Sequence, residues 1–248
     1  MTQFITNFST VFIQVIILFI FIGCGFIGGK KKFISAEGSK VMSNILLYFV
    51  TPCLIITSLN IEFDKQKFID LIVCFGAFTA VQVVTILLVT LIFKGKERKT
   101  TTVLRLAVIF SNVGYMGLPL QSAVLGEEGL FYGSICVASF NLVVWTYGIA
   151  YSSGDKKVLS LKGIVFNPGI IAVTVGILFF LFSVKLPTPI KTAMEGMAGM
   201  NTPLAMLIIG YNLAASNILK ALKDKKVYLV SFLRLIAVPL VSLAVFYL

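Results

Sequence analysis

Residues 111–120 read Ser-Asn-Val-Gly-Tyr-Met-Gly-Leu-Pro-Leu and lie in the middle of an otherwise apolar segment. The asparagine, the two glycines and the proline all disfavour an uninterrupted helix, so the sequence predicts a helix that breaks near Asn112. In hydrocarbon, a broken backbone leaves N–H and C=O groups unpaired, so it occurs only inside protein or beside a wet cavity. Such discontinuous helices hold the binding sites of many membrane proteins that move solutes.

The rest of the chain is apolar enough to cross a bilayer several times. Its 248 residues are 58% hydrophobic and 12% charged, with a mean hydropathy of +1.00, whereas a soluble domain has about 25% charged residues. A span needs about 20 apolar residues. We predict an all-α, polytopic membrane protein with eight spans, which are residues 8–29, 40–60, 68–93, 103–125, 129–152, 163–183, 192–215 and 227–248.

The basic residues lie between the apolar runs and alternate in density. Sixteen of them lie in odd-numbered connections, namely Lys30, Lys31, Lys32, Lys40, Lys94, Lys96, Arg98, Lys99, Arg105, Lys156, Lys157, Lys162, Lys220, Lys223, Lys225 and Lys226. The even-numbered connections hold four, namely Lys65, Lys67, Lys185 and Lys191. The positive-inside rule therefore predicts a cell-membrane protein with its N-terminus outside. The net charge of +11 belongs to these loops and does not indicate nucleic-acid binding.

A short internal similarity indicates a duplicated architecture. Thr51-Pro52-Cys53-Leu54 resembles Thr202-Pro203-Leu204, which lies 151 positions and five spans later. An offset of five spans inverts the orientation, so we predict inverted repeats, with a complete five-helix repeat over 1–152 and an incomplete one over 153–248. The expected counterpart of the break lies beyond residue 248, and we expect the last two of ten spans to be missing.

Asn112 is the first candidate for binding a substrate. Its amide offers two donors and an acceptor oxygen, which suits a carboxylate without burying a fixed cation. Breaks at Gly114, Gly117 and Pro119 would free backbone N–H groups at the N-terminus of a half-helix, which attracts anions. The alternative is an ordinary kinked span whose asparagine bonds a neighbouring helix.

Other polar residues lie within apolar runs. Thr51 and Thr202 precede Pro52 and Pro203, and their hydroxyls could bond carbonyls freed by proline kinks. Several further polar side chains either line a cavity or form hydrogen bonds between helices. These are Ser43, Asn44, Asn141, Asn201 and Asn212.

Arg234 is the deepest cation, about eight residues into the last run. Binding of a ligand and snorkelling to the interface both remain open for it. Asp70 and Glu195 lie near span ends, where solvation explains them. We interpret Cys24, Cys53, Cys74 and Cys136 as buried small hydrophobes, since no metal-ligand spacing, histidine or phosphate loop accompanies them. We therefore expect no metal, no cofactor and no enzymatic activity.

Several motifs together resemble the auxin efflux carrier family, which includes the plant PIN-formed carriers and bacterial permeases for malate and malonate. The similarity runs from end to end, and residues 111–120 are its most specific part. The other matching segments are 18–29 with the basic turn after it, 48–55, 167–169, 206–213, and Arg234 with Pro239.

The resemblance implies a ten-span fold of two inverted five-helix repeats, similar to bile acid and sodium symporters, in which the fourth and ninth spans break and cross. It also implies that spans 1, 2, 6 and 7 form a scaffold, whereas spans 3–5 and 8 form a transport domain that moves like an elevator. The combined set of candidate substrate-binding residues is Thr51, Pro52, Ser111, Asn112, Gly114, Gly117, Pro119, Asn141, Asn201, Thr202 and Pro203.

Two functions follow from this sequence. The first is a secondary transporter that moves small organic anions, auxin-like or malate- and malonate-like carboxylates, by alternating access around the crossover helix. The alternative is a truncated, transport-incompetent paralogue that acts as a regulatory or partner membrane subunit. The predicted partners are the anion and the lipid bilayer, with a proton or sodium as coupling ion and a homodimer left open, and no nucleic acid.

Overall fold

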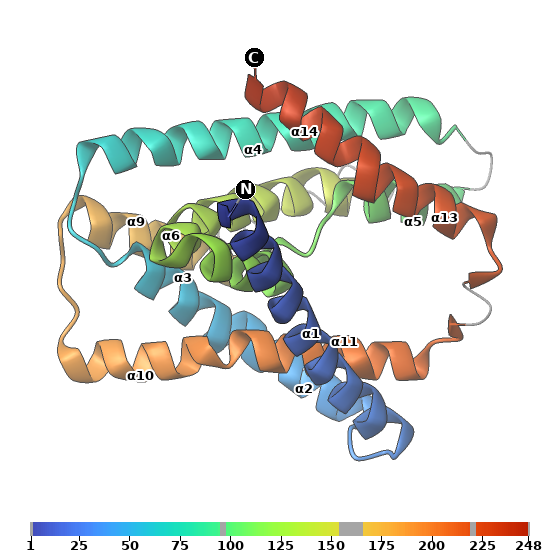
Figure 1. Cartoon of the computed structure of the whole chain (residues 1–248), viewed down its shortest axis with the longest axis horizontal. Helices are drawn as coiled ribbons and strands as arrows, with labels where there is room; N and C mark the ends of the chain where they lie inside the picture. Colours follow the sequence, from blue (N-terminus) through green and yellow to red (C-terminus); the bar gives the residue numbers. More distant parts are fainter. Residues whose placement is uncertain (1, 95–97, 154–165, 219–221, 248) are drawn as a thin grey trace. The chain divides into compact units, whose positions relative to one another are not determined.

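The structure is a computed structural model that describes residues 2–94, 98–153, 166–218 and 222–247 (Figure 1). All regular elements in these ranges are helical, which confirms the all-α prediction. They are α1 (Thr2–Lys30), α2 (Ala36–Ile45), η1 (Leu46–Val50), α3 (Thr51–Leu59), α4 (Lys65–Ile92), α5 (Arg98–Ile109), η2 (Val113–Gly117), α6 (Leu118–Val143), η3 (Val144–Gly148), α7 (Ile149–Ser153), α9 (Pro168–Leu181), α10 (Thr188–Gly199), α11 (Asn201–Ala215), α13 (Lys225–Phe232), η5 (Leu233–Ala237) and α14 (Val238–Tyr247), where η marks a π-helical turn.

Five helical segments in the described residues are long and apolar enough to cross a membrane. They are Phe8–Lys30, Ala36–Leu59, Lys65–Ile92, Thr100–Ser152 and Lys225–Ala244, and Pro168–Leu181 is a shorter apolar helix. The chain is therefore a multi-pass membrane protein, whereas eight spans remain a prediction. The start of the predicted span 163–183 lies outside the described residues, as do Lys96, Lys156, Lys157, Lys162 and Lys220.

The predicted helix break is present at residues 110–112. Helix α5 ends at Ile109, and η2 begins after Asn112, whose φ of −82° and ψ of 67° are not helical. A second interruption lies inside α6 at Gly126, where φ is 66° and ψ is −143°. Glycine is favoured there because a Cβ disfavours positive φ. This kink separates the runs predicted at 103–125 and 129–152.

Three of the π-helical turns lie directly before a proline. Pro52, Pro119 and Pro239 are each the second residue after η1, η2 and η5 respectively. Proline lacks an N–H group, and its ring clashes with the carbonyl four residues earlier. A π-helical turn is one way in which a helix accommodates such a local disturbance. The prolines therefore account for the position of these turns.

The chain forms two compact units. Unit 1 comprises Met1–Asp64, Asn112–Ser134 and Pro168–Ile218, and unit 2 comprises Lys65–Ser111, Ile135–Asn167 and Leu219–Leu248. Unit 1 therefore contains the first, second and seventh predicted runs, most of the sixth, and residues 112–134 of the fourth and fifth. The boundary between the units falls inside the helix break, between Ser111 and Asn112. The scaffold and transport roles of these runs remain predictions.

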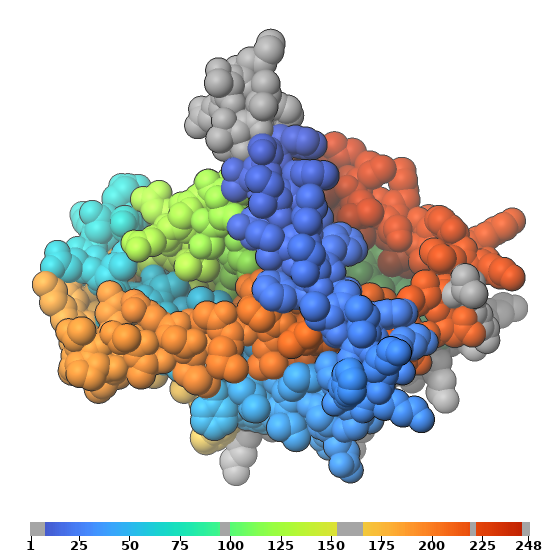
Figure 2. Space-filling view, turned by 60° about the horizontal axis from the view of Figure 1, so that its bottom comes forward, coloured from blue at the N-terminus to red at the C-terminus, as the bar shows by residue number. Residues whose placement is uncertain are grey.

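Helices α1 and α11 of unit 1 cross in close contact (Figures 1 and 2). Glycines make this approach possible, because a Cβ on Gly25 would lie 2.3 Å from the Leu207 carbonyl oxygen, and one on Gly210 would lie 2.1 Å from the Ile22 carbonyl oxygen. Small residues at a crossing let two backbones approach within a membrane. The position of α11, and of Asn201 at its start, therefore depends on these glycines.

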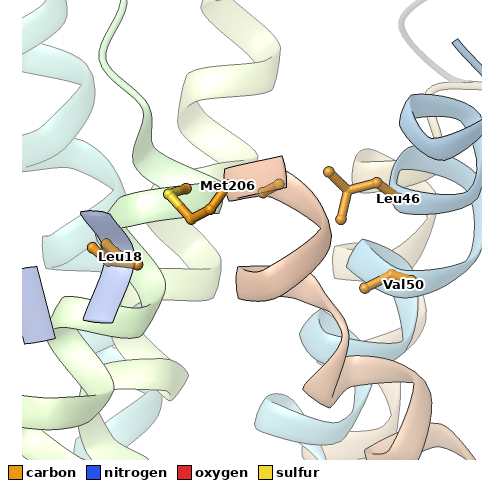
Figure 3. Packing of buried hydrophobic residues seen from close by; sticks show 5 residues of the cluster. Leu18, Leu46, Val50 and Met206 are labelled. Atoms are coloured by element: carbon orange, nitrogen blue, oxygen red, sulfur yellow. The ribbon is translucent and has the colours of Figure 1, made fainter. Parts of the chain in front are cut away.

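Met206 of α11 is the centre of the core of unit 1. It lies between Leu18 of α1 on one side and Leu46 and Val50 of the second run on the other (Figure 3). Tyr115 of η2 packs against the same cluster. The core therefore joins the helix that follows the break to α1, η1 and α11.

Unit 2 has its own core, in which α4 and α5 pack together and α14 crosses α4 (Figure 1). Its buried residues are Val89, Phe93, Val108 and Ile109. Arg105 completes the α4 end, since its guanidinium donates to the carbonyls of Thr90 and Phe93. A cation at a helix C-terminus is favourable because the carbonyls there have no helical partner.

Candidate functional site

The N-terminus of the helix that follows the break has hydrogen-bond donors without a partner in the described part of the chain. The Asn112 side-chain oxygen accepts a hydrogen bond of 3.1 Å from the Tyr115 backbone N–H, so Asn112 is the N-cap. Its Nδ2 group and the backbone N–H groups of Val113 and Gly114 have no acceptor among the described residues. Asn112 is exposed, and a Cβ on Gly114 would meet nothing within 4 Å. Three donors therefore remain at this helix end.

Two further predicted residues support this helix end from within unit 1. The Asn201 Nδ2 group donates to the Gly114 carbonyl at 3.3 Å, and the Thr51 hydroxyl donates to Asn201 Oδ1 at 3.5 Å. Asn201 is buried, with an exposed fraction of 2%. We call Thr51, Asn112, Gly114 and Asn201 the crossover cluster. The structure thus brings together residues from three predicted runs.

The remaining predicted residues in the described part of unit 1 make no side-chain hydrogen bond to the helix end at Asn112. The expectation that Thr51 bonds a carbonyl freed by a kink was wrong, because its hydroxyl donates to Asn201 instead. The Thr202 hydroxyl has no hydrogen-bond partner among the described residues. Pro203 lies in the first turn of α11, where its missing N–H breaks no helical bond. A Cβ on Gly117 would make an ordinary 3.5 Å contact with the Asn112 carbonyl oxygen.

Unit 2 contains a cavity of about 530 Å³ that sequence reasoning found only in part. We call it the Arg234 cavity. Its polar lining comprises the predicted residues Ser111 and Arg234 and three that were missed, namely Gln82, Thr85 and Ser242. The available signal for these three was a polar side chain within an apolar run. Asn141, also predicted, is not among the lining residues.

Arg234 holds the C-terminal end of α5. Its Nη1 group donates to the Val108 carbonyl at 2.6 Å and to the Ile109 carbonyl at 3.2 Å. These carbonyls lose their helical donors because the helix stops at Ile109, and the guanidinium replaces them. The structure therefore places Arg234 at the break, which favours a local role over snorkelling alone.

Two ion pairs in the described part of unit 1 lie on its surface, one between two interhelical connections and one within α10. Lys185 donates to Glu62 at 2.8 Å, and this hydrogen bond holds the pKa of Glu62 below its ordinary 4.5 and the pKa of Lys185 above its ordinary 10.5. Lys191 and Glu195 are 3.8 Å apart. All four side chains are largely exposed, so water screens both pairs. These charges are consistent with a solvated surface.

The interpretation of the cysteines as buried was wrong. Cys24 is exposed, and Cys53, Cys74 and Cys136 are partly exposed. All four lie on membrane-spanning helices, where lipid replaces the protein core as the apolar environment. Within the described ranges, no three potential metal-binding side chains come together.

Comparisons with known proteins agree with this architecture. The sequence matches the family described as membrane transport protein over residues 10–159 and 155–248, which confirms the resemblance to auxin efflux carriers. An uncharacterized transporter from Methanocaldococcus jannaschii is 26% identical over 220 residues, which cover 84% of this chain and 70% of the relative. An uncharacterized transporter from Methanothermobacter thermautotrophicus is 28% identical over 218 residues, which cover 85% of this chain and 70% of the relative.

Proposed function

Because this chain belongs to the membrane transport protein family, we propose that it is a secondary transporter of small organic anions. The observation that carries the proposal is the helix break at residues 110–112, with three unpaired donors at the start of the following helix. The anions are mono- or dicarboxylates, and alternating access takes place around this break.

The chemistry of the helix end suits a carboxylate. A helix N-terminus has the effect of about half a positive charge, and its first N–H groups point toward an approaching anion. Asn112 Nδ2 adds a neutral donor whose burial costs far less than that of a cation. Because this end has no fixed charge, it can bind a carboxylate and also release it, as transport requires.

The movement in this proposal follows the predicted division of the chain. The first, second, sixth and seventh runs form the scaffold, and the third to fifth and eighth runs form the moving domain. The N-terminus lies outside the cell, as the distribution of basic residues favours. Asn201 of the scaffold donates to the Gly114 carbonyl of the moving domain, so this hydrogen bond has to break when the moving domain changes position.

The test is carboxylate flux into proteoliposomes that contain the purified full chain. Malonate, malate and indole-3-acetate are each compared with their neutral amides, with and without proton and sodium gradients. We expect flux of at least one carboxylate and none of its amide. No flux of any carboxylate would refute the proposal.

Asn112→Asp is the sharpest variant, because aspartate keeps the N-cap acceptor but replaces the Nδ2 donor by a negative charge. We expect the initial rate to fall by about tenfold or more, the loss that about 1.4 kcal/mol produces. Asn212→Ala is the matched control, because Asn212 is an exposed asparagine on α11. Equal flux in Asn112→Asp and wild type would contradict the role of the break.

A further inference from the structure

The Arg234 cavity has one charged residue and no acidic residue in its lining. It is formed by α4, the end of α5, η5 and α14, all within unit 2. Its volume of about 530 Å³ is within the range of small-molecule sites. A cation within a membrane-spanning segment is a functional candidate by default, and its partner has to be identified.

Arg234 uses only part of its hydrogen-bonding capacity. Nη1 donates to the two α5 carbonyls, whereas Nε and Nη2 have no acceptor among the described residues. Arg234 has no carboxylate partner among the described residues. The Nε and Nη2 edge of a guanidinium presents two parallel N–H groups, which match the two oxygens of a carboxylate.

Arg105 of the same unit has its Nε and Nη2 edge occupied. Its Nε and Nη2 groups both donate to backbone carbonyls at the end of α4, and its guanidinium lies over the Tyr151 ring at 5.3 Å. Arg105 does not line the cavity. Both arginines therefore bind a helix end, but only Arg234 keeps the Nε and Nη2 edge unused.

Gln82 shows that a hydrogen-bond donor is also missing beside the cavity. Its exposed fraction is 4%, its Nε2 donates to the Ser139 hydroxyl at 3.0 Å, and its Oε1 has no partner. A buried polar atom without a partner calls for an explanation such as an absent water. A carboxylate cannot donate to Oε1, so the missing partner is a water or a hydroxyl group, and the anion itself binds to Arg234.

The other polar lining residues offer one more donor. The hydroxyls of Thr85 and Ser242 donate to their own helices, at the Val81 and Val238 carbonyls. The Ser111 hydroxyl has no hydrogen-bond partner among the described residues and can donate.

We propose that the Arg234 cavity is an anion-binding site that holds the carboxylate of a small organic acid on Nε and Nη2 of Arg234, with the Ser111 hydroxyl as a further donor. All residues of this binding site belong to unit 2. That the bound acid is also the transported anion rests on the proposed function. The site differs from the crossover cluster because it supplies a full positive charge.

The test is calorimetric titration of the purified full chain in nanodiscs with malonate, and with malonamide as the neutral analogue. We expect Arg234→Met to weaken malonate binding by about tenfold or more, because the charged bidentate contact is lost. Arg234→Lys, which keeps the charge but not the parallel N–H pair, should give an intermediate affinity. Arg105→Met is the matched control and should bind malonate as wild type does.

Gln82→Glu tests the site without removing Arg234. The new carboxylate lies in the lining of the same cavity and supplies an internal counter-ion, so malonate should bind more weakly. Gln82→Met, which adds no charge, should not weaken it. Circular dichroism and size-exclusion chromatography show whether each variant is folded. Wild-type affinity in folded Arg234→Met, or in folded Gln82→Glu, would overturn the proposal.

Asn112→Asp separates this inference from the proposed function. We expect this variant to lose flux and to keep Arg234-dependent binding of malonate. Binding without flux in the wild-type protein would refute transport and leave the cavity site standing. Flux with unchanged binding in Arg234→Met would refute the cavity site and leave transport standing. Complete loss of binding in Asn112→Asp would also overturn the cavity as an independent site.

Discussion

The two helix ends at the break have opposite kinds of partner, one a cation and the other a neutral amide. The C-terminal end at Ile109, in unit 2, is bound by the guanidinium of Arg234. The N-terminal end at Val113, in unit 1, is capped by the neutral amide of Asn112. Helix ends carry opposite partial charges of about half a unit, negative at the C-terminus and positive at the N-terminus. A cation neutralises the end that would repel an anion, and a neutral cap preserves the end that attracts one.

The environments of the two ends also differ. In unit 1, Asn201 satisfies both the Gly114 carbonyl and the Thr51 hydroxyl, so the polar groups behind the helix end are paired. In unit 2, Gln82 Oε1 has no partner, and part of the Arg234 guanidinium is unused. Paired polar groups fix a structure, whereas the unused Arg234 donors can take an anion and the unpaired Gln82 acceptor needs a water or a hydroxyl group. The difference predicts that variants in unit 1 affect stability more than variants around the cavity.

The largest effect is expected where α1 and α11 cross. In Gly210→Ala the new Cβ would overlap the Ile22 backbone, so the helices must separate, and we expect a loss of about 3 kcal/mol in the free energy of unfolding. Denaturant titration in detergent measures it. Gly23→Ala is the control, because a Cβ on Gly23 of α1 meets nothing within 4 Å. Equal stability of the two variants would contradict the close crossing.

The next effect concerns the support of the crossover cluster. Asn201→Leu leaves the Gly114 carbonyl and the Thr51 hydroxyl without this partner, and we expect a loss of about 2 kcal/mol. The same titration measures it, with Asn212→Leu as a control on the same helix. If Asn201→Leu is as stable as wild type, the crossover cluster is not the firmly paired region described above.

The neutral cap is expected to contribute less. Asn112→Ala removes the acceptor for the Tyr115 N–H, at a cost of about 1 kcal/mol in the free energy of unfolding. Asn112→Asp keeps this acceptor and should retain most of the stability. Denaturant titration of both variants checks the order. If Asn112→Asp is less stable than Asn112→Ala, the helix end does not favour a negative charge.

The smallest effect is expected outside the membrane, at Glu62 and Lys185. The lowered pKa of Glu62 means that the pair stabilises the fold above pH 4.5 and that this contribution is lost as the pH falls through the lowered pKa. The pKa of Lys185 is raised, so the contribution of Lys185 to stability is present below pH 10.5. It is lost as the pH rises through the raised pKa. Thermal unfolding of wild type and Lys185→Gln should differ slightly at neutral pH and converge in acid. If the difference in unfolding temperature between the two proteins grows in acid, the pairing is contradicted. Lys40→Gln, which removes the same charge elsewhere, is the control for net charge.

Sequence reasoning located the local features of this protein. The break near Asn112 follows from an asparagine, two glycines and a proline within ten residues, because each acts on the backbone next to it. The selection of Thr51, Asn201 and Arg234 as candidates rested on a polar side chain in an apolar run. Gln82 shows the same signal and was missed, since nothing in the sequence distinguishes it from a polar side chain that binds a neighbouring helix.

The helices, their interruptions and their membrane location are thus consequences of the sequence by itself, because apolar length and backbone chemistry act within a few residues. Only the tertiary structure decided which polar groups meet, such as Thr51 with Asn201, or Arg234 with the end of α5. The physical reason is that membrane-spanning helices are apolar on all sides, so their sequences lack the amphipathic pattern that identifies an inward face. The pairing of polar groups depends instead on how the helices pack.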